Sequence, residues 1–238
     1  MILGVYSKKT EMSGGFGGTR MSSSTRTYWF VRRVDDDTYE VQPLNQQHVP
    51  SGIVSRISKK TFMLEYAPEL DYYERKTLPV LKSLQRKLDQ GEKLFELKQL
   101  DAAESEFVKA LHIDEQNSQA SLRLGDIYCQ TKDHQRLKKA LARILNLDNV
   151  FIETERHRFN EFGTNLRKGG FLDESLAYYD KALSLNDHDE HLHFNVARVF
   201  YDLKDYGKCI DHLQRALALN QDFEEAKDFL EYCRKFNT

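Results

Sequence analysis

Apolar residues recur every three or four positions in the stretch from 156 to 189, which is the spacing of one face of an α-helix. The apolar positions that form these faces are Phe159, Phe162, Leu166, Leu176, Tyr179, Ala182, Leu183 and Leu185. Gly169 and Gly170 divide them into two groups, and glycine tolerates the positive φ with which helices commonly end. The pattern therefore predicts a hairpin of two amphipathic helices. One hairpin cannot bury both apolar faces, so neighbours of the same kind are expected.

The same pattern returns along the chain with a period of 34 residues. The predicted units are 84–117, 118–151, 156–189 and 190–223, with a four-residue insertion at Ile152–Glu155 and a single helix at 224–236. Small residues stand at the eighth place of each unit, namely Gly91, Gly125, Gly163 and Ala197. Large residues such as Phe107, Tyr179 and Leu213 stand sixteen places later. We expect the small residues to let two helices approach closely and the large ones to fill the space between them.

A 34-residue repeat with small residues at places eight, twenty and twenty-seven resembles the tetratricopeptide repeat family. The resemblance implies a mostly α fold, a right-handed α-solenoid of four helix-turn-helix repeats with a capping helix at 224–236. The family's tryptophan at place four and its proline near place thirty-two are absent from all four units. The second unit also has Leu137 and Ile144 at places where the family has small residues.

The first 80 residues have a different character from the rest, and they contain all four prolines. Residues 1–25 include the tracts GGFGG and SSST, which predict a flexible Gly/Ser-rich tail. Residues 26–80 predict a small β element and a linker, and the helical domain is expected over 81–238. The composition change places the domain boundary near residue 80.

Within the β element, two runs rich in β-branched and aromatic residues flank the turn Asp35–Asp37. They predict a hairpin of the strands Thr27–Val34 and Thr38–Leu44. A third strand is expected at Ile53–Ser58, followed by a short helix at Ser58–Tyr66. So few strands are not stable alone, and we expect them to pack against the helices that follow.

Composition and charge limit the function classes. The chain has 40% hydrophobic and 30% charged residues and a net charge of −2, as is ordinary for a soluble globular protein. It contains neither a long basic block nor an apolar run of about 20 residues, so neither a nucleic acid nor a membrane is expected as a partner. The apolar start is too short for a signal peptide, and Cys129, Cys209 and Cys233 form no CxxC motif. A cytoplasmic protein with free thiols is expected.

Motifs for catalysis and cofactor binding are missing from the sequence. Neither a nucleophile elbow nor a phosphate-binding loop occurs, so we expect no enzyme activity and no cofactor. His188, His191 and His193 lie among acidic residues, a composition that invites a metal site. His191 and His193 are two residues apart, however, and so point to different sides of a helix. We therefore interpret the acidic residues as a helix start and expect no metal.

The resemblance also implies binding residues, because in this family the first helix of each repeat lines a concave surface. The candidate partner-binding residues of the third and fourth units are His157, Asn160, Thr164, Arg167, Lys168, His191, Phe194, Arg198 and Tyr201. The first two units offer acidic residues such as Glu92 and Asp126 instead. A known subset of the family clamps chaperone carboxylates with lysine and asparagine in the first unit. Leu88 and Glu92 stand at those places, so such a clamp is not expected here.

Two functions remain open. The first is a non-enzymatic adaptor or scaffold that binds a peptide or protein partner, of unknown identity, in the concave groove. The alternative is a structural or assembly subunit, in which the N-terminal tail and β element mediate homo-oligomerisation or docking in a larger complex. An enzyme is the weakest hypothesis.

Overall fold

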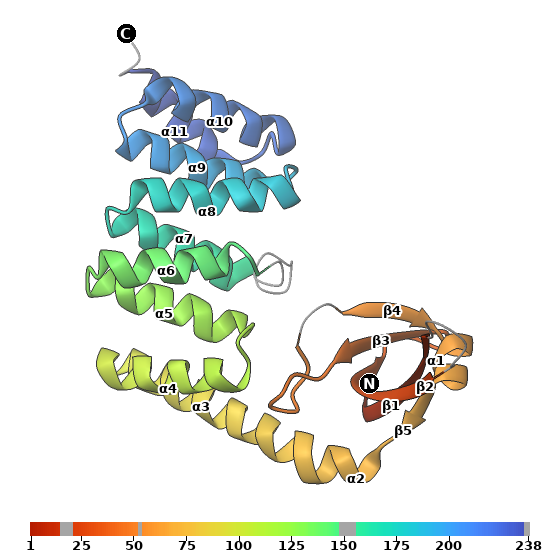
Figure 1. The fold of residues 1–238 in the computed structure, drawn as a ribbon. Helices are drawn as coiled ribbons and strands as arrows, with labels where there is room; N and C mark the ends of the chain where they lie inside the picture. Colours follow the sequence, from red (N-terminus) through yellow and green to blue (C-terminus); the bar gives the residue numbers. More distant parts are fainter. Residues whose placement is uncertain (15–20, 52–53, 148–155, 236–238) are drawn as a thin grey trace. The chain divides into compact units, whose positions relative to one another are not determined.

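The computed structural model describes residues 1–14, 21–51, 54–147 and 156–235. The chain forms two compact units, Met1–Asn117 and Ser118–Thr238, and each is described by itself. The first unit joins an antiparallel five-stranded sheet to helices, and the described part of the second unit is helical (Figure 1). The prediction of a mostly helical protein with an N-terminal β element is thus confirmed.

The sheet of the first unit has the strand order β4-β3-β2-β1-β5, and all neighbouring strands are antiparallel. Its strands are β1 (Ile2–Gly14), β2 (Met21–Arg33), β3 (Thr38–Pro43), β4 (Ser55–Ser58) and β5 (Tyr66–Pro68). The flexible tail predicted over 1–25 is therefore corrected for residues 2–14 and 21–25, because β1 pairs with β2 along its length and with β5 at Tyr6–Lys8. Residues 15–20, which hold most of the GGFGG tract, lie outside the described residues. Backbone hydrogen bonds carry this pairing, so serine and threonine side chains do not prevent it.

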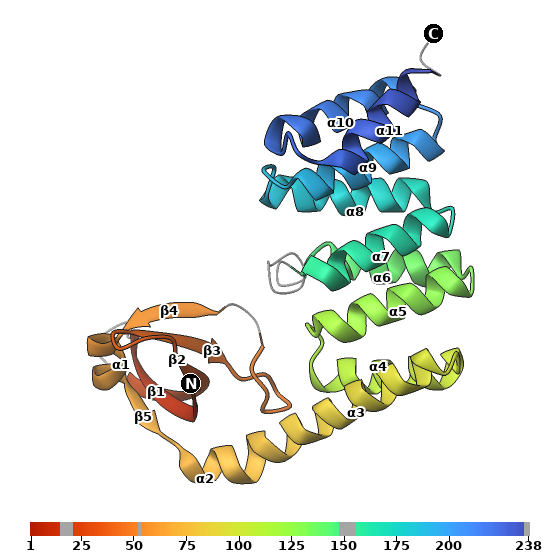
Figure 2. The same cartoon turned by 180° about the vertical axis from the view of Figure 1, so that it is seen from behind.

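A short helix, α1 (Lys59–Glu65), joins the two edge strands β4 and β5. A flat five-stranded sheet is about 19 Å wide, whereas a seven-residue helix is only about 10 Å long. The sheet therefore has to curl toward its own edges, as Figures 1 and 2 show. Phe62 of α1 fills the curled sheet together with Val31, Tyr39 and Val41.

A continuous helical run leads from the sheet into the first helical hairpin. It comprises α2 (Leu70–Tyr72), the π-helical turn η1 (Tyr73–Thr77) and α3 (Leu78–Glu96), and α4 (Leu100–Ile113) completes the hairpin. The Tyr72 ring stacks on Tyr28 at 4.1 Å between centroids, and Tyr73 lies against Gly4, which has a φ of 105°. Asn45 Nδ2 donates a hydrogen bond of 2.9 Å to the Ile113 carbonyl.

These contacts group the first hairpin with the sheet. The domain boundary expected near residue 80 instead falls inside a helical run, and the compact units divide between Asn117 and Ser118. The reason is that the sheet is too small to stand alone and packs on the hairpin that follows it. Whether all four hairpins form one domain stays a prediction.

The second unit stacks three further hairpins and one closing helix (Figures 1 and 2). Its helices are α5 (Ser118–Gln130), α6 (His134–Ile144), α7 (Arg156–Lys168), α8 (Leu172–Leu185), α9 (Glu190–Asp202), α10 (Tyr206–Leu219) and α11 (Glu224–Arg234). The first helices α5 and α7 pack on each other, as do the second helices α6 and α8. The insertion Ile152–Glu155 and residue 236 of the predicted capping helix lie outside the described residues.

Each hairpin turns through one residue with a positive φ. These residues are Lys98, Lys132, Gly170 and Lys204. The sequence predicts such a turn at Gly169 and Gly170, but three of the four turns place a lysine in the left-handed conformation that favours glycine. The turn geometry is therefore set by the helices that it joins and is not limited to glycine.

Small residues at the eighth place admit a large ring from a neighbouring helix. A Cβ at Gly91 would lie 2.7 Å from Phe107 Cε1, and one at Gly163 would lie 2.4 Å from Tyr179 Cζ. Both contacts agree with the expected role of these positions. In the second repeat a Cβ at Gly125 would instead meet Phe162 of the following hairpin.

Candidate partner-binding site

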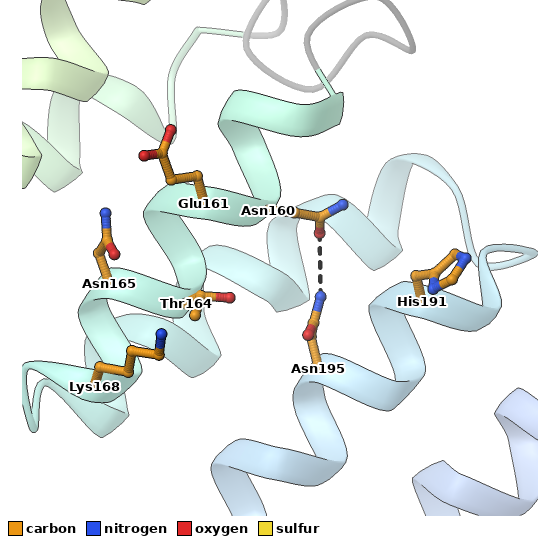
Figure 3. Close-up of a pocket in the computed structure, with 7 residues that line it drawn as sticks. All are labelled: Asn160, Glu161, Thr164, Asn165, Lys168, His191 and Asn195. Atoms are coloured by element: carbon orange, nitrogen blue, oxygen red, sulfur yellow. Dashed lines mark hydrogen bonds between the residues drawn. The ribbon is translucent and has the colours of Figure 1, made fainter. Parts of the chain in front are cut away.

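An open pocket of about 810 Å³ lies between the first helices of the last two hairpins, α7 and α9 (Figure 3). The residues that line it are Asn160, Glu161, Thr164, Asn165, Lys168, His191 and Asn195. All seven are polar, and five of them come from α7. We call the faces of α7 and α9 that carry them the inner face.

Helical spacing explains why these side chains share the inner face. Asn160, Thr164 and Lys168 follow one another at intervals of four on α7, and His191 and Asn195 do so on α9. The opposite side of α7 carries the buried apolar residues that hold the hairpin together. Across the pocket, Asn195 Nδ2 donates a hydrogen bond of 3.2 Å to Asn160 Oδ1 (Figure 3). The two helices are therefore bridged at the pocket itself.

A buried polar network with α5 fixes one wall of the pocket. Asn165 Nδ2 donates to Asp126 Oδ1 at 2.7 Å, and Arg123 Nη1 reaches Asp126 Oδ2 at 3.1 Å and Glu161 Oε2 at 3.4 Å. Asp126 is 2% exposed, and its burial raises the pKa of its carboxyl group to about 6. The family resemblance implied a groove position for Asp126, but the structure buries this side chain beneath Asn165.

Beside the pocket, the same two helices carry two arginines, Arg167 next to Lys168 on α7 and Arg198 three residues after Asn195 on α9. Arg167 Nη1 pairs with Asp202 Oδ2 at 2.5 Å. Tyr179 reaches this region from α8 past Gly163, and its hydroxyl hydrogen-bonds with that of Thr164. Burial raises the pKa of the Tyr179 phenol, and the nearby arginines oppose that rise.

Arg198 lies in the same region and is half-buried. Its guanidinium is 5.9 Å from the centre of the Phe194 ring. Desolvation lowers the pKa of Arg198, and the positive charge of Arg167 lowers it further.

The predicted residues divide into three groups. Asn160, Thr164, Lys168 and His191 line the pocket, and Arg167 and Arg198 lie beside it on the same two helices. Phe194 and Tyr201 instead face the closing helix, since both rings pack on Phe229 of α11, at 6.0 and 5.3 Å between centroids. The side chain of His157 lies outside the described residues.

Sequence reasoning missed three pocket residues, Glu161, Asn165 and Asn195. They stand at places six and ten of their repeats, next to the places that the family resemblance implies. The available signal was the recurrence of asparagine on the first helices of successive repeats, at 160, 165 and 195.

The three clustered histidines have different surroundings. The His191 ring packs on Phe223 at 4.9 Å between centroids, and His193 Nδ1 lies 3.1 Å from His212 Nδ1. His188 contacts the carboxylate of Asp187. Over the described ranges, the structure contains no group of three or more His, Cys, Asp or Glu side chains placed to hold a metal ion.

A second pocket, of about 780 Å³, lies in the first unit beside β5 and α1. Met63 and Leu64 on its rim are 67% and 80% exposed. Its charged residues are largely paired, with Lys8 Nζ 2.6 Å from Glu65 and Arg26 Nη1 3.3 Å from Glu69. Among the helices of the described residues, none is both long and apolar enough to cross a membrane.

Comparisons with known proteins agree with the repeat pattern. Residues 190–223 match the family model described as tetratricopeptide repeat. None of the curated proteins matches the chain by sequence. The family match coincides with the hairpin of α9 and α10, whose helices lie inside it.

Several solved structures are similar over about two thirds of the chain. MamA from Desulfovibrio magneticus RS-1 is 13% identical with a TM-score of 0.46, over 63% of this chain and 82% of that one. PilF of Pseudomonas aeruginosa is 15% identical with a TM-score of 0.46, over 66% and 75%. A thermophilic repeat protein of Thermus thermophilus is 22% identical with a TM-score of 0.43, over 63% and 80%. TM-scores of this size describe a loose likeness, from which neither a function nor a partner follows.

Proposed function

We propose that the chain, which matches the tetratricopeptide repeat model over residues 190–223, is a non-enzymatic adaptor whose second unit binds a peptide segment of a partner protein on the inner face of α7 and α9. The observation that carries this proposal is the all-polar pocket bridged by Asn160 and Asn195.

Asparagine suits the main chain of a peptide, because its amide both donates and accepts hydrogen bonds. The bond between the two amides uses one N–H of Asn195 and one lone pair of Asn160. Each amide therefore keeps a donor and an acceptor that can pair with a peptide N–H or C=O group. Lys168 and His191 are exposed at the edges of the pocket and can add contacts to side chains of the bound segment.

The titratable groups of the pocket support a binding role over a catalytic one. Glu161 is paired with Arg123 at 3.4 Å, and His191 Nε2 lies 3.7 Å from Glu190. Neither group is hydrogen-bonded to a nucleophile among the contacts of the described residues. The cytoplasmic location, and the lack of a nucleic-acid or membrane partner, stay predictions from the sequence.

Site-directed cross-linking tests the proposal. A photoreactive phenylalanine analogue placed at Lys168 or His191, in full-length protein in its native cells, should form a covalent adduct with one protein. The matched control is Ala177 on α8, which is also exposed. Adducts of equal yield at Ala177, or none at the two inner-face positions, would contradict the proposal.

A second candidate function is docking through the first unit, including docking on a second copy of this chain. The observation that favours it is the exposure of Met63 and Leu64 beside the second pocket. Large apolar side chains that are exposed together are typical of interaction surfaces. Light scattering after size exclusion tests the case of a second copy. An oligomer that dissociates when Met63 and Leu64 are both replaced by aspartate supports docking between copies, and a monomeric wild-type protein excludes docking between copies.

A further inference from the structure

Arg198 has no acidic partner in the described part of the chain, although it is half-buried. On the face of α9 toward α7, the successive residues are Asn195, Arg198 and Asp202. Two of these residues have partners on α7, since Asn195 bonds Asn160 at 3.2 Å and Asp202 pairs with Arg167 at 2.5 Å. Between them, the guanidinium of Arg198 contacts the face of the Phe194 ring and forms no ion pair among the described residues.

The surroundings of Arg198 disfavour its positive charge. Removal from water is the main cause that lowers its pKa, and the second is the positive Arg167. Asp202 acts in the opposite sense, but its carboxylate is already bound by Arg167. A partly desolvated charge without a partner is unfavourable, and an incoming anion would compensate it.

The remaining charges of the inner face have the same sign. Lys168 forms no ion pair among the described residues, whereas the negative Glu161 is paired with Arg123. The charges left over are therefore positive. The planar fork of an arginine matches a carboxylate, which it can bind through two parallel hydrogen bonds.

We propose that Arg198 binds the carboxylate of an aspartate or glutamate side chain in the bound segment, while Asn160 and Asn195 bind the main chain beside it. This inference rests on the proposed peptide-binding function. A side chain is favoured over a chain end because the polar face of α9 continues on both sides of Arg198, with Asn195 one turn before it and Asp202 one turn after it. The partner is therefore an acidic segment that runs along the inner face.

A selection from a random peptide library with amidated ends tests the inference on full-length protein. Wild-type protein should enrich peptides with aspartate or glutamate, and the Arg198→Met variant should lose that enrichment. Enriched peptides without acidic residues would overturn this inference and leave the peptide-binding function standing. If no peptide is enriched, both the inference and the proposed peptide-binding function fail.

The best selected peptide then gives the affinity by fluorescence anisotropy. Arg198→Met should weaken binding about tenfold or more, since hydrogen bonds between charged groups are worth that much. Replacing the acidic residue of the peptide by its amide should have no further effect on this variant. The peptide whose acidic residue is replaced by its amide is then tested on wild-type protein with a free carboxylate at its C-terminus. If it binds as tightly as the original acidic peptide, the anion that Arg198 binds is a chain end and the inference is wrong.

Stability separates binding from folding. Arg198→Met keeps the aliphatic stem on Phe194 and removes an uncompensated charge, so its melting temperature should equal or exceed that of the wild type. Arg143→Met, at an exposed arginine of α6, is the matched control and should change neither the melting temperature nor the affinity for the acidic peptide. A variant at Arg198 that binds the acidic peptide as tightly as the wild type would overturn the inference.

Discussion

Replacing Gly163 with alanine should destabilise the protein, although alanine is the better helix former. Gly163 lies within α7, where Gly→Ala alone would stabilise a helix by about 1 kcal/mol. The added Cβ would lie 2.4 Å from Tyr179 Cζ and 2.5 Å from its hydroxyl oxygen. Tyr179 is 1% exposed, so its ring cannot move aside into solvent. Overpacking of this kind costs about 1–3 kcal/mol, and a contact this short belongs to the upper half of that range. The net loss should therefore be about 1–2 kcal/mol.

Gly207 provides the matched control for this substitution. It lies in α10, and a Cβ there would meet only Asp205 Oδ1 at 3.8 Å. Gly207→Ala should therefore stabilise the protein by about 0.5–1 kcal/mol. Urea unfolding followed by circular dichroism at 222 nm compares the two variants with the wild type.

A double-mutant cycle identifies the contact. If Tyr179 causes the loss at Gly163, then Tyr179→Leu should cost less in the Gly163→Ala background than in the wild type. Equal stabilisation by Gly163→Ala and Gly207→Ala would refute the reasoning, because it would mean that no ring occupies the place beside Gly163.

Four further predictions concern titration, turns and thiols. Burial and the neighbouring His193 lower the pKa of His212 to about 4 from 6.5, so its contribution to stability is full above pH 6.5 and is lost as the pH falls toward 4; His212→Leu should flatten the melting temperature over that range. Asp126 acts in the opposite sense, since its raised pKa of about 6 means that stability falls as the pH rises from 3.8 to 6, and Asp126→Asn should remove this slope in the same thermal scans. Lys204→Gly should stabilise the protein by about 0.5–1 kcal/mol in urea unfolding, because lysine there has a φ of 63°, and a loss of stability would show that this turn is not strained. All three cysteines are buried, and burial raises the pKa of Cys129 to about 11, so a thiol reagent should react with them only after denaturant is added; fast reaction of the folded protein would contradict their burial.

The sequence predicts the helical hairpins well, because they depend on residues that are close to one another in the sequence. The spacing of Phe159, Phe162 and Leu166 defines one face of α7, and the small Gly163 on the same helix admits Tyr179 sixteen residues later. Both features depend on neighbours within one or two turns or on the next helix. The 34-residue period then carries the same pattern from hairpin to hairpin.

The N-terminal strands could not be predicted in the same way. β1 and β5 are paired over a sequence separation of about sixty residues, and the β5 strand is only three residues long. The polar tracts near β1 favour a tail by composition, and only the partners of the strand decide otherwise. Strand pairing is tertiary information that a local pattern does not contain.

The candidate site is intermediate between these cases. Helical places implied Asn160, Thr164, Lys168 and His191, which the structure brings together in one pocket. The partners of each side chain were not foreseeable. Phe194 turns toward α11 because Phe223 and Phe229 offer an apolar neighbour, and this contact exists only once the closing helix has packed.

Hydrogen–deuterium exchange on the full-length protein, with and without the partner recovered by cross-linking, tests the central claim most directly. If the inner face is the binding site, protection should concentrate in peptides covering α7 and α9, from 156 to 168 and from 190 to 202, while α6, α8 and α10 exchange as before. Protection confined to residues 1–68, with α7 and α9 unchanged, would contradict the account and assign the partner to the sheet of the first unit.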